Sequence, residues 1–142
     1  MIIPDLNILL YAVDSSSLRN REAIGWLQEA VNSGKELIGI PWVVHLGFLR
    51  LTTNPRVFTR PLTVEAATAW LESLEEHPSV RMLNPGDSHP GILRHLLLML
   101  GTGANLVTDA HLAALALEHN ATLATGDRDF SRFQGLKTVF VF

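Results

Sequence analysis

Residues 105–130, NLVTDAHLAALALEHNATLATGDRDF, decide how the chain is expected to fold. The stretch 107–119 is rich in Ala and Leu and predicts a helix with a buried face. The short apolar segment Leu123–Thr125 follows closely and predicts a buried strand. A helix leading into a buried strand is the repeating unit of parallel sheets, so this block predicts an α/β fold.

The same alternation extends outward from this block to both ends of the chain. Further strands are predicted at 1–5, 37–40, 80–83 and 138–141, and further helices at 6–14, 19–32, 42–52, 63–77 and 88–100. The chain has 142 residues, so we expect one α/β domain, residues 1–142, with a mostly parallel sheet. Ligands of such sheets bind beyond the carboxyl ends of the strands.

Composition excludes several classes of protein. The chain has no cysteine, which excludes disulfides, thiolate metal sites and cysteine nucleophiles. The longest apolar stretch, Ile38–Leu49, is shorter than the ~20 residues that cross a bilayer, so no membrane span is expected. The N-terminus lacks the pattern of a secretory signal, and we expect a cytoplasmic protein. The net charge of −3 is not that of a duplex-binding domain, although a nuclease with an acidic centre is compatible with it.

Three aspartates stand where the predicted elements meet. Asp5 ends the first strand, and Asp127 follows the strand Leu123–Thr125 after one glycine, so both are expected at the same edge of the sheet. Asp109 lies in the first turn of a helix, on its packing face. If these carboxylates converge, a cation must balance their repulsion, and oxygen ligands without thiolates indicate Mg²⁺ or Mn²⁺. Taken singly, each acid is also compatible with a helix cap, an Asx turn or a helix N-terminal charge.

Three blocks of sequence resemble the VapC-type toxins of the PIN-domain ribonucleases. They are IIPDLNILLYA (2–12), PWVVHLGFLRLTTNPRVF (41–58) and NLVTDAHLAALALEHNATLATGDRDFSRFQGL (105–136). The resemblance implies a three-layer α/β/α fold and a divalent-metal endoribonuclease that is the toxin of a type II toxin–antitoxin system. It also implies RNA as the substrate, a cognate VapB-like antitoxin and a homodimer. In this resemblance Asp5, Asp109 and Asp127 match the acidic positions that hold the metal and carry catalysis.

One position departs from the family pattern. PIN domains usually place a glutamate in the helix after the second strand, and here Gly47 stands in its place. Either three carboxylates and water hold one cation, or Asp129 or Asn105 supplies a further ligand, or the centre is catalytically weak. Mg²⁺ retains several waters, which favours the first alternative. The last corresponds to a degenerate module that binds RNA or a partner protein without cleaving RNA.

Three further residues are predicted to support the acids. Asn7, two residues beyond Asp5, is predicted either to orient a carboxylate or a water or to cap the helix. Thr125 is expected from the resemblance to lie near the metal. Asp129 is predicted mainly as the cap of a short helix ending at Phe133, and it is the reserve ligand.

Two arginines are candidates for RNA binding. Arg50 and Arg56 border or occupy the predicted loop 54–62, and if this loop lies along the acidic edge their guanidinium groups can hold RNA phosphates. The apolar stripes of helices 19–32 and 63–77 predict a groove for a partner helix. The three tryptophans stand in helical stripes and are predicted to lie in the core; they are Trp26, Trp42 and Trp70.

Overall fold

A computed structural model describes residues 1–142, and its five strands form one parallel sheet in the order β3-β2-β1-β4-β5. The strands are β1 (Ile2–Pro4), β2 (Ile38–Pro41), β3 (Val80–Leu83), β4 (Thr122–Thr125) and β5 (Lys137–Phe140). Strands β1 and β4 lie side by side in the middle, with Ile3 opposite Leu123. The predicted strands are therefore confirmed, each to within one residue at either end.

Six helices and one short 3₁₀ helix connect the strands. They are α1 (Leu6–Val13), α2 (Asn20–Asn32), α3 (Trp42–Thr52), α4 (Val64–Glu75), α5 (His89–Leu100), α6 (Leu106–Glu118) and η1 (Arg128–Arg132). None of them is long and apolar enough to span a membrane.

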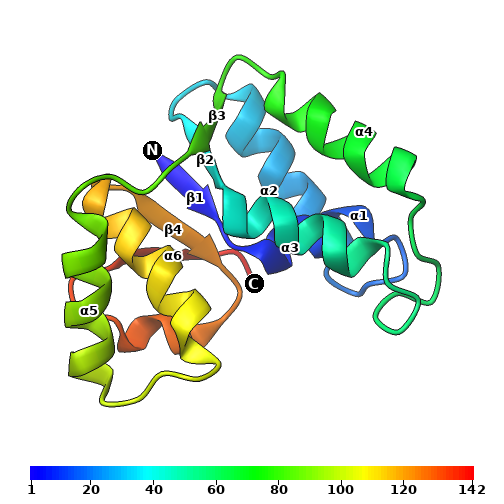
Figure 1. The fold of residues 1–142 in the computed structure, drawn as a ribbon. Coiled ribbons are helices and arrows are strands. Elements are labelled where there is room, and N and C mark those ends of the chain that lie inside the picture. The colour runs from blue at the N-terminus through cyan, green and yellow to red at the C-terminus, as the bar shows by residue number, and fades with distance from the viewer.

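The helices form two layers, one on each face of the sheet. From β1 the chain adds β2 and then β3 on one side of the sheet, and it then returns to add β4 and β5 on the other side. Because crossovers between parallel strands are right-handed, this reversal places α1 to α4 on one face of the sheet and α5 and α6 on the opposite face. Figure 1 shows α5 and α6 together at the left of the strands and α2 to α4 at the right. The predicted three-layer α/β/α fold is confirmed.

Burial on both faces explains why the strands are so apolar. Ile3, Ile38, Ile40 and Leu123 are all fully buried, as expected for a parallel sheet covered on both sides. The middle of helix α6 is buried at Ala110 and at every residue from Leu112 to Ala116. Because α6 is fixed in the core, the residue in its first turn, Asp109, is held on a rigid support.

The prediction that all three tryptophans lie in the core is wrong for Trp42, whose side chain is 50% exposed. Helix α3 turns Val44 and Phe48 into the core, so Trp42 and Leu46 face away from it. Trp70 is half-buried and stacks on Phe48, with ring centroids 4.8 Å apart. The apolar stripe of this helix was recognised in the sequence, but the sequence did not show which of its residues face the sheet.

A buried histidine joins the two helices on the second face. His89 at the start of α5 is buried, and its Nε2 lies 2.9 Å from Nδ1 of His111 on α6. The His89 Nδ1 lies 3.5 Å from a carboxylate oxygen of Glu118. His89 is therefore a structural residue that links α5 to α6.

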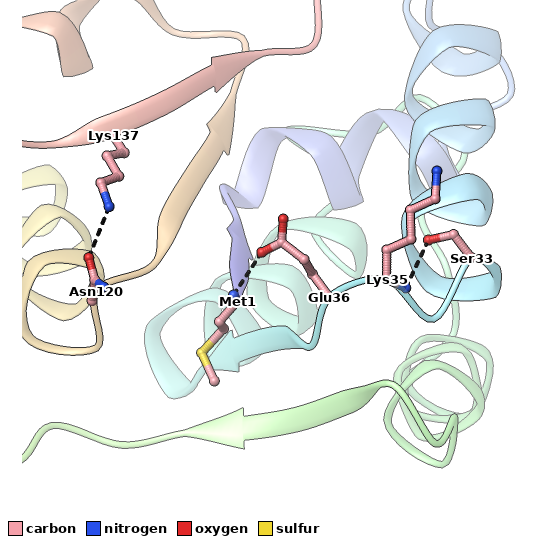
Figure 2. Close-up of polar contacts among 6 residues, drawn as sticks. All are labelled: Met1, Ser33, Lys35, Glu36, Asn120 and Lys137. Atoms are coloured by element: carbon pink, nitrogen blue, oxygen red, sulfur yellow. Dashed lines mark hydrogen bonds and ion pairs between the residues drawn. The ribbon is translucent and has the colours of Figure 1, made fainter.

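The amino ends of the strands are closed by local polar contacts. The Met1 amino nitrogen donates to Glu36 at 2.8 Å, and Lys137 Nζ donates to Asn120 Oδ1 at 3.0 Å (Figure 2). In the same view the Lys35 amide donates to Ser33 Oγ. These contacts lie at or just before the amino ends of strands, whereas Asp5 follows β1 directly and Asp127 follows β4 after one glycine.

Candidate active site

The candidate site lies where the direction of the strand order changes. The chain leaves β1 for β2 on one side and leaves β4 for β5 on the other, which opens a crevice beyond the carboxyl ends of β1 and β4. Asp5 follows β1 as the residue before α1, and its amide donates to Ala124 O at 2.8 Å. Pairing of the two central strands therefore places Asp5 beside the end of β4.

Thr125 connects two of the predicted acids. Its hydroxyl donates to Asp5 Oδ2 at 2.9 Å and accepts from the amide of Asp127, also at 2.9 Å. Thr125 is fully buried, and Asp5 is 6% exposed. One buried hydroxyl thus holds the carboxylate that follows β1 and the backbone that follows β4.

Burial gives Asp5 an unusual affinity for its proton. Desolvation raises the pKa of Asp5 from 3.8 to about 6, although hydrogen bonds from Thr125 and from the Leu6 backbone oppose the rise. The negative charges of Asp109 and Asp127 raise this pKa further. The three acids predicted from the sequence are therefore electrostatic neighbours in the folded chain.

Asp109 reaches the same region from the opposite layer. It stands in the first turn of α6, and partial burial raises its pKa, with smaller contributions from the charges of Asp127 and Asp129. None of these acids lies within ion-pairing distance of an arginine, lysine or histidine. The protein therefore gathers negative charge at this edge without an ion pair to any of these acids.

The helix cap predicted for Asp129 is supplied by Asp127 instead. Asp127 precedes η1 with an extended backbone, and its Oδ1 accepts from the Asp129 amide at 2.8 Å. Asp127 is therefore the cap, and the prediction that Asp129 caps this helix is wrong. The reason is that the helical turn starts one residue earlier, at Arg128, which leaves the Asp129 carboxylate exposed.

The donor chemistry fits a hard divalent cation. The crevice offers carboxylate oxygens, and burial, with a smaller contribution from neighbouring negative charges, raises the pKa values of Asp5 and Asp109. No three histidine, aspartate or glutamate side chains lie close enough to form a ready coordination shell. The residues thus fit a cation held by a few carboxylates with water completing its coordination, and they do not fit a closed protein cage.

Leu6 occupies the space beside Gly47. A Cβ atom added at Gly47 would lie 2.6 Å from Leu6 Cδ2, so even a methyl group there requires the leucine to move. Asn105, one of the proposed substitutes, is exposed at the start of α6. The space beside Gly47, where the resemblance implied a glutamate, is therefore filled by an apolar side chain, one residue after Asp5.

The remaining predicted residues separate into two groups. Asn7 lines a pocket that also includes Asp127, in keeping with its predicted supporting role, and its side chain caps no helix. Arg50 and Arg56 are exposed, and neither forms an ion pair with the acids.

Sequence reasoning missed four residues of the pocket beside Asp127, namely Tyr11, Arg19, Arg128 and Phe142. For Arg128 a signal was present, since it directly follows Asp127 beyond the end of β4. Arg19 and Phe142 are far from the acidic motifs in the sequence, and only the folded chain brings them to the pocket.

Comparison with known proteins identifies the family. The sequence model of the PIN domain family matches residues 2–136. The chain belongs to the PIN domain family. Among curated PIN proteins, it is 45% identical to Ribonuclease VapC37 of Mycobacterium tuberculosis over 96% of this chain and 94% of the relative. It is 42% identical to Ribonuclease VapC33 of the same organism, over 96% of this chain and 95% of the relative.

Solved structures show that the PIN fold is shared over the whole chain. VapBC2 from Rickettsia felis, bound to a DNA fragment from its promoter, matches with a TM-score of 0.72 and 19% identity, over 99% of this chain and 98% of the matched chain. VapBC-1 from nontypeable Haemophilus influenzae matches with a TM-score of 0.70 and 22% identity, over the same shares of the two chains. At these identities the likeness extends to the fold alone.

Proposed function

We propose that this PIN protein is a VapC-type ribonuclease that hydrolyses phosphodiester bonds of RNA and is the toxin of a type II toxin–antitoxin system. The observation that carries the proposal is the set of uncompensated carboxylates at the carboxyl ends of β1 and β4. Its support from comparison is the 45% identity to Ribonuclease VapC37 over nearly the whole of both chains.

In this proposal Asp5, Asp109 and Asp127 hold Mg²⁺ or Mn²⁺. When bound, the cation supplies a Lewis acid that activates water and neutralises the charge developing on the phosphate. Thr125 orients Asp5 through its hydroxyl and fixes the backbone of Asp127. Burial raises the pKa of Asp5 to about 6, and a bound cation would lower it again by stabilising the ionised carboxylate.

Two residues complete the proposed acidic centre. Asn7 offers an amide beside Asp127, where it can hold a water or a carboxylate oxygen. The exposed carboxylate of Asp129 adds negative charge next to Asp109, as its effect on the pKa of Asp109 indicates. Neither residue is required to be a direct ligand.

Arg50 and Arg56 remain proposed contacts to RNA phosphates outside the centre, since both are exposed and carry free positive charge.

The second candidate function is a PIN module that binds RNA or a partner without cleaving it. Gly47 favours it, because Leu6 takes the space of the usual acid. A cleavage assay separates the two functions: bacterial total RNA is incubated with the purified chain in Mg²⁺, in Mn²⁺ and in EDTA. We expect products with either metal, none in EDTA, and none from an Asp5→Asn variant. Absence of metal-dependent products from the native chain contradicts the enzymatic proposal and leaves the binding module.

The proposed protein partner is a VapB-like antitoxin. A pocket of about 300 Å³ opens between α2 and α4, and its apolar lining suits one face of an amphipathic helix. Its lining includes Ile24, Leu27, Val31, Trp70, Leu74 and His77.

Copurification of the antitoxin with the tagged chain tests this surface. We expect Leu74→Lys to prevent copurification, because it places a charge in the apolar groove. The matched control is Leu98→Lys, which changes an exposed leucine on α5, and it should retain the antitoxin. Loss of the antitoxin from both variants, or from neither, contradicts docking in this groove.

We also propose that the chain forms a homodimer. Two large apolar side chains one helical turn apart, Trp42 and Leu46 on α3, are at least half exposed and support an apolar contact between copies. Light scattering after size exclusion measures the state directly. A monomer at micromolar concentration contradicts the proposal.

A further inference from the structure

A pocket of about 440 Å³ opens beside Asp127, on the side of the acids that faces α1 and α2. We propose that this pocket is the subsite for a nucleotide flanking the scissile phosphate of single-stranded RNA, with Arg19 binding the phosphate of that nucleotide. The inference rests on the proposed ribonuclease function and assigns the substrate side of the same site.

The pocket is assembled from four separate parts of the chain. Helix α1 contributes Asn7 and Tyr11, the start of α2 contributes Arg19, the turn after β4 contributes residues 126–128, and Phe142 completes the wall. A candidate catalytic residue, Asp127, is part of this lining. A group bound in the pocket therefore lies next to the acidic centre.

Both arginines of the pocket are held by aromatic rings. The Arg19 guanidinium carbon lies 5.2 Å from the centroid of the Phe142 ring, and that of Arg128 lies 4.1 Å from the Phe140 ring. Stacking fixes the plane of a guanidinium group while leaving its N–H donors free. Arg19 has one long contact with Glu22, at 3.4 Å, and Arg128 forms no ion pair. The pocket thus presents oriented donors to an incoming anion.

The charge of the pocket suits a phosphate next to carboxylates. An RNA backbone approaching Asp127 is repelled unless cations lie close by, and Arg19 and Arg128 are the cationic side chains of this pocket. A guanidinium fork matches two phosphate oxygens at once. Arg50 and Arg56, by contrast, are not among the residues that line this pocket.

An aromatic wall completes the features of a nucleotide site. The rings of Tyr11 and Phe142 meet edge to face, with centroids 5.5 Å apart. Phe142 packs on the backbone of Gly126, where a Cβ atom would collide with the ring. Aromatic surfaces beside arginines bind the bases of single strands by stacking, with little dependence on sequence. The pocket therefore fits a phosphate together with an unpaired base.

Binding of a labelled oligoribonucleotide tests the subsite. The probe is a fluorescein-labelled single-stranded RNA of mixed sequence, and Asp5→Asn serves as the background that prevents cleavage. In this background Arg19→Ala is compared with Arg21→Ala, which removes the same charge from an exposed neighbour outside the pocket. Anisotropy titrations at several salt concentrations give Kd and its salt dependence.

We expect Arg19→Ala to raise Kd about tenfold and to lower the slope of log Kd against log salt by about 1, because one phosphate contact is lost. Arg19→Lys should keep the salt slope and recover only part of the affinity, since a lysine keeps the charge and loses the fork. Arg21→Ala should leave both quantities unchanged. Tyr11→Leu should weaken binding without changing the salt slope, because stacking releases no counterions.

The outcomes separate this inference from the proposed function. Equal Kd values for the Arg19→Ala and Arg21→Ala proteins, while the native chain cleaves RNA, overturn the subsite and leave the ribonuclease. Failure of the Asp5→Asn protein to bind the probe also overturns the subsite. Absence of metal-dependent cleavage by the native chain overturns the ribonuclease, and a selective effect of Arg19 on binding would then still identify the RNA site of a binding module.

Discussion

Replacement of Asp5 by asparagine is expected to stabilise the metal-free protein above pH 6. The variant keeps an oxygen that accepts from the Thr125 hydroxyl but removes a buried charge. In the folded protein the pKa of Asp5 is about 6, against 3.8 for the ordinary side chain, so the folded state holds the proton more tightly than the unfolded state. Stability must therefore fall as pH rises between these two values.

The magnitude follows from the same pKa values. Ionising Asp5 in the folded, metal-free protein costs roughly 3 kcal/mol at pH 7, a large share of the ~5–15 kcal/mol that stabilises a typical domain. The cost is absent about one pH unit below 3.8, where the carboxyl is protonated in both states, and it is complete somewhat above pH 6. The advantage of Asp5→Asn over the native chain should grow by this amount from about pH 3 to pH 7 and then remain constant.

Denaturant unfolding in EDTA across this pH range measures the effect. The control is Asp87→Asn, which removes one negative charge from an exposed position outside the site and reports the influence of net charge alone. Added Mg²⁺ should stabilise the native chain at pH 7 and leave Asp5→Asn unchanged. A stability difference that does not vary with pH would refute the reasoning, because it would mean that the carboxylate is solvated in the folded protein.

Three further predictions concern residues around the site. Thr125→Val removes the hydroxyl that holds Asp5 and should lower the cleavage rate roughly 10- to 100-fold in single-turnover kinetics. Thr125→Ser keeps the hydroxyl and should retain most of the activity. Equal rates for the two variants would contradict a role for the hydroxyl. Gly47→Ala forces Leu6 to move, which should offset the gain of about 1 kcal/mol expected when alanine replaces a helical glycine and leave the unfolding free energy little changed. In a Leu6→Ala background the same change should be stabilising, and additive effects in a double-mutant cycle would argue against this contact. His89→Ala should lower the free energy of unfolding, measured by chemical denaturation, by about 2 kcal/mol. Its effect on the cleavage rate per folded molecule should be smaller. An unchanged unfolding midpoint would contradict the structural role of His89.

The fold was predictable because its signals are local and consistent. Each strand is a short apolar run that is buried on both faces, and the helices between them carry continuous apolar stripes. The order of the strands in the sheet could not be predicted from local signals, since it depends on pairings between distant segments, such as Ile3 with Leu123. The resemblance to PIN domains implied a layered fold of this kind, whereas periodicity alone predicted only α/β.

The residues of the candidate site that could be predicted are those that lie next to the ends of strands. Asp5 and Asp127 follow directly from their positions after β1 and β4, but the cap at η1 was assigned to the wrong one of two aspartates two residues apart. Arg19 and Phe142 were missed because packing of α2 on α1 and the course of the chain beyond β5 bring them to the pocket. No local pattern marks a residue whose role depends on such distant contacts.

The glycine at position 47 bears on the electrostatics of Asp5. Burial already disfavours ionisation of Asp5 in the metal-free protein, the charges of Asp109 and Asp127 add to this effect, and a further acid nearby would increase it. In this chain Leu6 fills the space with apolar atoms that pack against α3. The substitution thus removes one possible ligand and at the same time lowers the charge that a cation must balance. A site of this composition therefore places less negative charge around a cation, and it depends more strongly on the few acids that it keeps.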